Sequence, residues 1–512
     1  MKNNTRDRSS RRRRRTGVKS TPARQPDYRN LRHPFEPQKV FSDDEITNIH
    51  DTALRVLEEL GIKVLLPEAR EIFAKAGARV VEDMVYIGRD IVISAIETAP
   101  KSIRLRTVNP VNELNYELGA MVFAPGSGCP NVTDLERGRR PGSLADHIET
   151  IKLAQSFDVI HTLGQSAEPQ DIPIQFRHYE MVRAALEFSD KQPHLYSRGR
   201  GQVTESFEMI QLGLDLSDDE FQGDVWCHTI INTNSPRLLD NPMAQGIIDF
   251  ARAGQMTVIT PFCLSGAMAP VTVSGALALQ HAESLMGIVL AQLAKAGAPV
   301  SYGGFSSNVD MKSGAPAFGT PEHIKLQIGG GQLARHIGLP WRSAVGVASN
   351  TADMQAALET NMSLWGTMMA GATLTLHAAG WQEGGLSFGY EKFINDIEAL
   401  QTVAELCSRP SGSMAEIGFE ALADVQPGGH FFATQHTMDR YETAFYQPLV
   451  ADLRNVGTWQ DAGAKTSTER ATEIWKRILA DFKPPAGSGD IVDRLMPYIE
   501  AGKARGGAAP VE

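Results

Sequence analysis

Residues 320–340 read TPEHIKLQIGGGQLARHIGLP, and residues 342–349 follow them as RSAVGVAS. The first stretch predicts a helix, because Thr320 is a good N-cap, Pro321 suits the first helical position and Gly338 suits the end. The second stretch is short and mostly apolar, which is typical of a buried strand. A helix that leads into a short buried strand is the repeating unit of an α/β protein.

The same alternation recurs between residues 121 and 408. Eight strand-like segments are each followed by a helical stretch: Met121–Gly126, Val159–Ser166, His194–Gly199, Val225–Asn234, Met256–Leu264, Val300–Ser307, Arg342–Ser349 and Thr373–Gly380. Eight such units are what a TIM (β/α)8 barrel of roughly 250 residues needs. A doubly wound sheet is the alternative, but no glycine-rich dinucleotide fingerprint follows the first strand. The sequence therefore predicts an α/β fold with a TIM barrel.

Further segments flank the predicted barrel at 121–408. Residues 1–40 are rich in Arg, Pro and Ser without periodicity, which predicts a disordered basic tail. Residues 41–120 predict an N-terminal extension of helices and strands, opened by a capping box at Ser42. Residues 409–512 predict a C-terminal helical arm.

Composition restricts the function. The 512 residues include 42% hydrophobic and 21% charged residues, and the net charge of -10 argues against nucleic-acid binding. The longest apolar region, Val271–Val300, is interrupted by polar residues such as Glu283, which predicts a buried helix and no membrane span. No apolar stretch follows the Arg11–Arg15 run to make an export signal. The four cysteines lack metal-site spacing and suit a reducing compartment, so we expect a cytoplasmic protein.

In a TIM barrel the active site lies at the carboxyl ends of the strands. The segments found there are rich in hydroxyls, amides and aromatic rings, and they match no H-E-x-x-H, G-x-S-x-G or phosphate-loop motif. They contain no lysine for a Schiff-base lyase or aldolase and no paired Cys/His spacing, so no metal site is predicted at the barrel mouth.

Aromatic residues at several strand ends suggest a site for a cation. A ring face attracts an ammonium group by roughly 0.5–2 kcal/mol per contact, although each ring could instead fill the barrel. The candidate cage consists of Phe262, Tyr302, Phe305 and Trp381. Glu168 or Asp310 could balance the cation's charge. If the ligand also carries a carboxylate, the donors at neighbouring strand ends are Arg198, Asn234 and His377.

Several stretches resemble the trimethylamine methyltransferase family, in the order in which that family has them. They are Arg139–Asp146, Gly319–His323, Leu333–Pro340, Asp353–Ala356 with Glu359, Ala370–Gly380, Gly428–Phe431 and His436–Thr437, followed by Trp459 and Gly463. The resemblance spans roughly residues 40 to 490. It is the ordered set, more than any single motif, that is specific.

The resemblance implies an enzyme that moves a methyl group from an amine to the cobalt of a corrinoid (cobalamin-type) cofactor. A separate corrinoid protein carries this cofactor and docks at the barrel mouth, and we expect a homo-oligomer. The chain is written in the twenty standard residues, so it resembles the branch without pyrrolysine, which acts on quaternary amines such as glycine betaine. Where the family usually has an Asp-Ser-Lys-like segment, this chain has Ser349-Asn350-Thr351, which leaves the identity of the amine open.

A quaternary amine also fits the chemistry. Its nitrogen leaves as a neutral amine, so the protein needs mainly to orient the N–methyl bond and exclude water. The cofactor supplies the nucleophile. Two alternatives remain: a catalytically retired barrel that binds a betaine, and a barrel lyase that would have to use Lys312.

Overall fold

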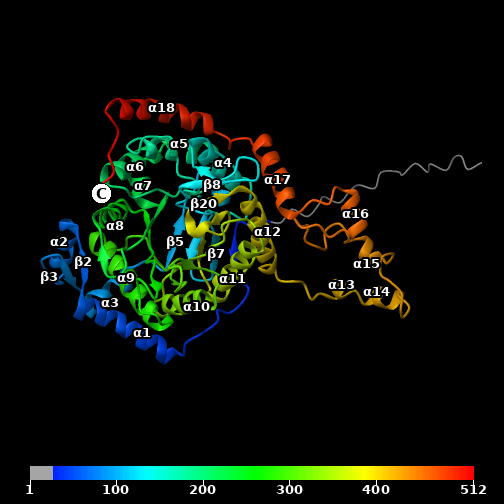
Figure 1. Ribbon diagram of the computed structural model, residues 1–512, viewed down its shortest axis with the longest axis horizontal. Coiled ribbons are helices and arrows are strands. Elements are labelled where there is room, and N and C mark those ends of the chain that lie inside the picture. The colour runs from blue at the N-terminus through cyan, green and yellow to red at the C-terminus, as the bar shows by residue number, and fades with distance from the viewer. Residues whose placement is uncertain (1–26, 512) are drawn as a thin grey trace, which may run out of the picture. The chain divides into compact units, whose positions relative to one another are not determined.

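The computed structural model describes residues 27–511 of the chain (Figure 1). The described residues form two compact units. The larger comprises 28–409 and 448–511, and the smaller contains 410–447. The part of the expected basic tail at residues 1–26 lies outside the described residues.

A parallel sheet forms the centre of the larger unit, and Figure 1 shows helices on all sides of it. The strand order is β1-β7-β18-β17-β14-β12-β10. All neighbours from β7 to β10 pair in parallel, and only β1 is antiparallel. The bounds are β1 (Leu31–Arg32), β7 (Ala120–Phe123), β10 (His228–Ile231), β12 (Met256–Ile259), β14 (Val300–Gly303), β17 (Trp341–Ala344) and β18 (Leu374–Leu376). The parallel strands are buried almost throughout, as expected for strands covered on both faces.

Two of the eight expected strand segments, 159–166 and 194–199, are not regular strands. Each makes one isolated parallel bridge, Thr162 with Gln192 and His194 with His228. The backbone N–H of His161 also donates to the carbonyl of Phe123 in β7. Side-chain amides replace part of the ladder, because Gln192 and Gln165 donate to the carbonyls of Val225 and His194. The predicted α/β class is confirmed.

A helix follows each strand segment, as the alternation in the sequence predicts. The helices are α4 (Leu144–Gln155), α5 (Arg177–Phe188), α6 (Arg200–Leu214), α8 (Asn241–Ala253), α9 (Val273–Ala294), α10 (Pro321–His336), α11 (Met354–Ala370) and α12 (Tyr390–Leu406). Side-chain caps set the starts of α4, α8, α9, α10 and α11, as where Thr320 accepts from the N–H of His323. A short helix that the sequence did not predict, α7 (Asp218–Gly223), begins at a capping box on Ser217.

The helix α9 is the long buried helix that the sequence predicts. Among the described residues it alone is long and apolar enough to cross a membrane, and 83% of its apolar window is buried inside the protein. It packs against α1 (Asp43–Arg55), α3 (Arg89–Thr98) and α8. The N-terminal extension thus covers a core helix of the central α/β structure.

The N-terminal extension is a mixed layer of helices and strands. Its elements are α1, a π-turn at Val56–Leu60, β2 (Ile62–Val64), α2 (Pro67–Lys75), β3 (Arg79–Val81), β4 (Met84–Tyr86), α3, and the hairpin β5 (Ser102–Leu105) and β6 (Leu114–Glu117). A small sheet runs in the order β11-β2-β4-β3, where β11 is Leu238–Leu239. One strand of that sheet therefore comes from the loop after β10.

Residues 28–40 differ from the predicted tail. Tyr28 and Leu31 are buried, and Leu31 in β1 lies opposite Met121 of β7. These residues are therefore ordered against the central sheet. Two apolar anchors in a polar segment are too few to produce a periodic sequence pattern.

Several short strands lie in the segments that follow the strands of the central sheet. They are β8 (Asn131–Thr133), β9 (Arg140–Pro141), β13 (Leu264–Ser265), β15 (Ser307–Val309), β16 (Pro316–Ala317), β19 (Trp381–Gln382) and β20 (Ser387–Gly389). In the larger unit, α16 is Val456–Asp461, α17 (Ser467–Asp481) packs on α12, and α18 (Ser488–Ala504) packs on α5 and α6. The smaller unit holds α13 (Met414–Ile417), α14 (Phe419–Asp424) and α15 (Gln435–Met438).

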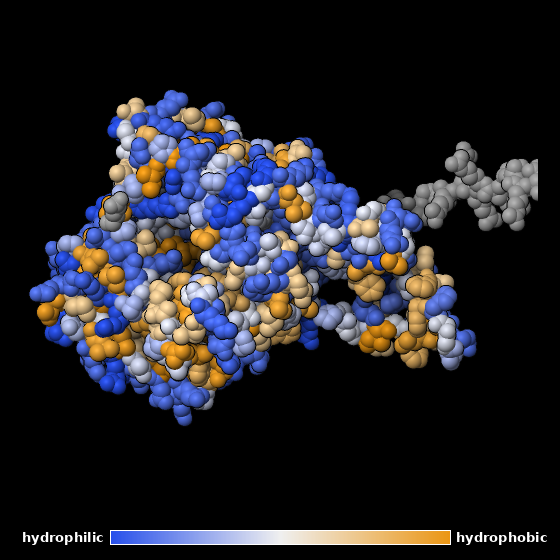
Figure 2. Space-filling model, viewed as in Figure 1, coloured by the Kyte–Doolittle hydropathy of each residue, from blue (hydrophilic) through white to orange (hydrophobic). Residues whose placement is uncertain are grey.

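On the face shown in Figure 2, polar side chains cover most of the larger unit and apolar ones form separate patches.

Candidate active site

A cavity of about 310 Å³ lies at the carboxyl ends of the parallel strands. Ile230 of β10, Arg342 of β17 and Leu376 of β18 line it from the strands. The other lining residues belong to the segments that follow the strands, such as Asn232 and Phe262. The cavity is therefore where a parallel α/β structure places its ligands.

Aromatic rings form one wall of this cavity. The rings of Phe262 and Phe305 stack with centroids 5.3 Å apart, and Trp381 meets Phe305 edge to face at 5.6 Å. His377 stacks on Trp381 at 4.7 Å. All four line the cavity, as the sequence predicted for ligand-binding residues at strand ends. Such a wall suits an alkylated ammonium group, which needs ring faces and cannot donate hydrogen bonds.

The floor of the cavity carries a buried cation, Arg342. Its side chain is only 1% exposed, and its guanidinium lies 5.1 Å from the centre of the Phe305 ring. Nε and Nη1 are buried without a hydrogen-bond partner among the described residues. Burial lowers the pKa of Arg342 to about 9, so the group is still charged at neutral pH. Unpartnered N–H groups on a buried cation favour an anionic ligand.

His377 adds a second donor beside this cation. Its Nδ1 accepts the backbone N–H of Ser127, and its Nε2 lies 3.3 Å from Nη2 of Arg342. Burial, followed by the charge of Arg342, holds the pKa of His377 well below its ordinary value, so the ring is neutral. With Nδ1 as an acceptor, hydrogen bonding assigns the proton to Nε2. Two donors then face each other, and an acceptor that bridges them would satisfy both.

Further polar groups complete the floor. His194 lies 3.3 Å from the hydroxyl of Ser127 and stacks on His228 with centroids 5.1 Å apart. Burial and the neighbouring His228 hold the pKa of His194 well below its ordinary value, so it too is neutral. The cavity thus combines neutral imidazoles and one positive charge with an aromatic wall.

Three predicted ligand residues lie elsewhere, in the part of the chain that the structure describes. Tyr302 is fully buried and its hydroxyl lies 3.2 Å from Nδ1 of His281 on α9, because alternation along β14 turns it outward. The amide of Asn234 donates to Asp240, and the exposed carboxylate of Asp310 accepts from Ser313. Tyr302, Asn234 and Asp310 therefore lie outside the candidate site.

Glu168 and Arg198 pair with each other. Nη1 of Arg198 lies 2.5 Å from Oε1 of Glu168, and Nη1 of Arg177 lies 2.8 Å from the same oxygen. Burial alone would raise the pKa of Glu168, but the hydrogen bond and charge of Arg198 outweigh it and the pKa is lowered. Neither Glu168 nor Arg198 lines the cavity at the strand ends, so the expected roles of Arg198 on a carboxylate and Glu168 on a cation are not supported there.

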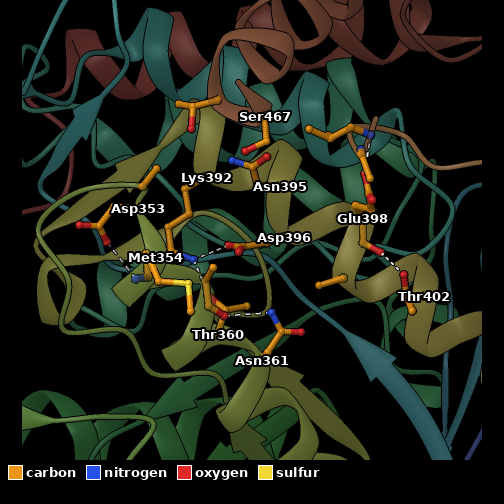
Figure 3. A pocket seen from close by; sticks show the side chains of 17 residues that line it. Asp353, Met354, Thr360, Asn361, Lys392, Asn395, Asp396, Glu398, Thr402 and Ser467 are labelled. Atoms are coloured by element: carbon orange, nitrogen blue, oxygen red, sulfur yellow. Dashed lines mark hydrogen bonds and ion pairs between the residues drawn. The ribbon is translucent and has the colours of Figure 1, made fainter. Parts of the chain in front are cut away.

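A larger cavity, of about 560 Å³, lies between α11, α12 and α17 (Figure 3). Lys392 and Asp396 meet in it at 2.6 Å, and Lys392 also donates to Thr360 at 2.8 Å. Glu398 accepts the backbone N–H of Ala451. These charges already have partners within the protein, so the cavity at the strand ends is the better candidate site.

Breaking the buried pair tests how strongly it holds α12. Lys392→Met leaves Asp396 in a buried position without its counter-ion, and burial already raises the pKa of that carboxyl. We expect the free energy of unfolding to fall by about 3 kcal/mol in urea titrations. The double variant Lys392→Met/Asp396→Leu should recover most of the loss. Equal losses in the single and double variants would contradict this account.

The described residues 27–511 contain no group of three or more His, Cys, Asp or Glu side chains arranged to hold a metal ion. Cys129, Cys227, Cys263 and Cys407 are free thiols, and the first three are buried. The sequence-based expectation that no metal binds at the barrel mouth stays a prediction.

Sequence reasoning missed several polar residues of the site, which are Ser127, His194, Tyr196, Asn232 and Arg342. The candidate residues lie mostly just beyond the strands, whereas Arg342 lies inside β17 and its long side chain reaches the cavity. The available signal was a charged residue within an otherwise apolar strand segment, since charges are rarely buried without a functional reason.

Comparison with known proteins identifies relatives of this chain. The family model for trimethylamine methyltransferase (MTTB) matches residues 6–507. The glycine betaine methyltransferase of Desulfitobacterium hafniense (strain Y51) is 33% identical over 462 residues, covering 90% of this chain and 96% of that protein. The proline betaine:corrinoid methyltransferase of Eubacterium limosum is 28% identical, covering 90% and 98%.

The fold has a relative among solved structures. The monomethylamine methyltransferase of Methanosarcina barkeri aligns with a TM-score of 0.51 at 8% sequence identity, covering 90% of this chain and 88% of that one. At this identity the likeness concerns the fold alone. The family model covers nearly the whole chain and the resemblance read from the sequence is confirmed: this chain belongs to the trimethylamine methyltransferase family.

Proposed function

We propose that this protein transfers a methyl group from a betaine, a quaternary amine with a carboxylate, to the cobalt of a corrinoid that a partner protein carries. The single observation behind this choice is Arg342, a buried and unpartnered cation below an aromatic wall. A simple methylamine would leave that cation unbalanced. Relatives named for glycine betaine and proline betaine support the proposal.

The cavity suits both ends of such a ligand. The carboxylate would accept from Arg342 and from Nε2 of His377, and charge-assisted hydrogen bonds of this kind are strong. The trimethylammonium group would lie against the ring faces of Phe262, Phe305 and Trp381. Binding at both ends fixes the orientation of the amine relative to the mouth of the cavity.

The residues of this chain orient the substrate and exclude water. When the C–N bond breaks, its electron pair stays on nitrogen, and the product is a neutral tertiary amine that needs no proton from the protein. The neutral His194 and His377 fit this chemistry, because no acid is required. The partner's corrinoid supplies the cobalt nucleophile that accepts the methyl group. Arg342 and the aromatic wall hold one N–methyl bond in line for that transfer.

We also propose that the central sheet closes into an eight-stranded TIM barrel. The bridges at Thr162 and His194, together with the hydrogen bond from His161 to Phe123, connect β7 to β10 through the two irregular segments. The helices around the strands support the same architecture (Figure 1). The expected bounds of the barrel at 121–408, and of the flanking domains, stay predictions.

The corrinoid protein would dock over the loops that follow the strands. These loops expose large apolar side chains, including Met311 at 72% and Val271 at 70%. Met311→Asp is expected to slow methyl transfer to the corrinoid protein about tenfold, because a charge in an apolar interface is costly, while betaine affinity stays unchanged. Ile93→Asp, on the exposed face of α3, is the matched control. Equal slowing by both variants would contradict docking at the mouth.

The experiment that tests the function is methyl transfer to reduced cobalamin. The protein with glycine betaine should form methylcobalamin and dimethylglycine in equal amounts, whereas trimethylamine should give little product. Betaine binding without any transfer, either to cobalamin or to a corrinoid protein, would indicate a barrel that has lost its catalytic activity and would overturn the proposal.

We also propose that the protein is a cytoplasmic homo-oligomer. Its four free thiols suit a reducing compartment.

A further inference from the structure

Glu283 is a buried carboxylate in the middle of α9 that does not line the cavity. Its side chain contacts the segment that follows β10. Oε2 accepts the hydroxyls of Thr233 and Ser235, each at 2.6 Å, and Oε1 accepts the backbone N–H of Arg237 at 2.7 Å. Three donors from one loop thus converge on a single carboxylate.

The network continues to the next two strand ends. The hydroxyl of Ser235 lies 3.3 Å from Sγ of Cys263, which follows β12. The backbone N–H of Cys263 donates in turn to the hydroxyl of Ser306 at 3.2 Å. These contacts join the segments after β10, β12 and β14. Each of those segments contributes a residue to the cavity, respectively Asn232, Phe262 and Phe305.

Burying a carboxylate in an apolar helix is costly unless hydrogen bonds compensate for the lost hydration. Burial raises the pKa of Glu283, and the hydrogen bonds from Ser235, Thr233 and Arg237 only partly oppose that rise. Hydrophobic packing of α9 would be served as well by leucine. Only a multiple hydrogen-bond acceptor can hold the hydroxyls of Thr233 and Ser235 and the N–H of Arg237 at once.

We propose that Glu283 is a positioning residue, which fixes the loops after β10 and β12 so that Asn232 and Phe262 face the bound amine. Glu283 acts through these loops and makes no contact with the cavity itself. The effect on substrate rests on the proposed function, whereas the effect on the loops does not.

The loops can be tested first without substrate. In Glu283→Ala, hydrogen exchange of the backbone amides of the non-proline residues at 233–237 and 262–264 should accelerate at least about tenfold. Glu283→Gln should give a smaller change, because its carbonyl oxygen can still accept from Thr233 and Ser235. It also keeps the test valid if the alanine variant does not fold.

Gln292 offers a matched control on the same helix. It is buried, and its side chain accepts the N–H of Gly297 and donates to the carbonyl of Ala298, near the end of α9 that leads into β14. Gln292→Ala should accelerate exchange around 295–299 and leave 233–237 and 262–264 unchanged. If Glu283→Ala and Glu283→Gln change these loops no more than Gln292→Ala does, the proposal is overturned.

Kinetics then separate positioning from general loss of structure. Glu283→Ala should raise the KM for glycine betaine about tenfold, and in a Phe262→Ala background the same change should raise it less than about threefold. Fully additive effects on KM would overturn the role through Phe262. If no betaine is a substrate, the proposed function fails and hydrogen exchange alone decides the role of Glu283.

Discussion

Arg342→Met is expected to weaken glycine betaine binding by at least about 100-fold while making the free protein more stable. The binding loss follows from removing the charged donor for the carboxylate, since hydrogen bonds to charged groups contribute roughly 1.5–3 kcal/mol each. The gain in stability follows from removing a buried charge that has no counter-ion. Isothermal titration calorimetry and urea denaturation measure the two effects.

The pH dependence of stability gives an independent check. Burial lowers the pKa of Arg342 to about 9 in the folded protein, so the unfolded chain holds this proton more tightly. The penalty on folding is therefore fully present below about pH 9 and is released as the pH rises above it. Arg342→Met should abolish this component of the pH dependence.

Arg198→Met is the matched control for the binding experiment. Because Arg198 is held by Glu168 and does not line the cavity, its loss should change betaine affinity less than about threefold. Choline, which lacks the carboxylate, should bind Arg342→Met at least as tightly as the wild type, because the variant removes a like charge from the cavity. If Arg198→Met weakened betaine binding as much as Arg342→Met, the assignment of the carboxylate to Arg342 would be wrong.

Trp381→Leu is expected to remove most of the preference for a cationic ligand. Glycine betaine and 3,3-dimethylbutyrate have nearly the same shape, but only the betaine carries the positive charge. The wild type should favour the betaine by roughly 10- to 30-fold, as expected from one or two cation–π contacts, and the variant by less than about threefold. Competition binding of the two ligands measures the ratio.

The control must separate lost packing from lost recognition. Trp475 is also a buried tryptophan, but it lies on α17 and donates its indole N–H to Glu391, away from the residues that line the cavity. Trp475→Leu should destabilise the protein and leave the ligand ratio unchanged. An unchanged ratio in Trp381→Leu would mean that the aromatic wall does not select for charge.

The sequence predicted those elements whose boundaries depend on local chemistry. Helix α10 was readable because Thr320, Pro321 and Gly338 mark its ends, and the strands were readable as short apolar runs. The segments at 159–166 and 194–199 were predicted as strands but make only isolated bridges. Their side-chain hydrogen bonds to the backbone depend on tertiary contacts, which a local pattern does not contain.

Only some residues of the candidate site could be predicted from the sequence. Phe262, Phe305, His377 and Trp381 were found because the fold fixes where strand ends meet. Tyr302 was misplaced by one step of strand alternation. The roles of Arg198 and Glu168 depend on their mutual pairing, and the importance of Arg342 depends on its lack of a partner. Neither property can be read from a residue's position in the chain.

The most direct test of this account is a crystal structure of the protein with glycine betaine. The account requires the ligand in the cavity at the strand ends, with its carboxylate within hydrogen-bond distance of Arg342 and His377. The trimethylammonium group should lie against Phe262, Phe305 and Trp381, with one methyl group toward the mouth. A carboxylate bound to Arg198, or a ligand seated in the larger cavity between α11 and α12, would contradict it.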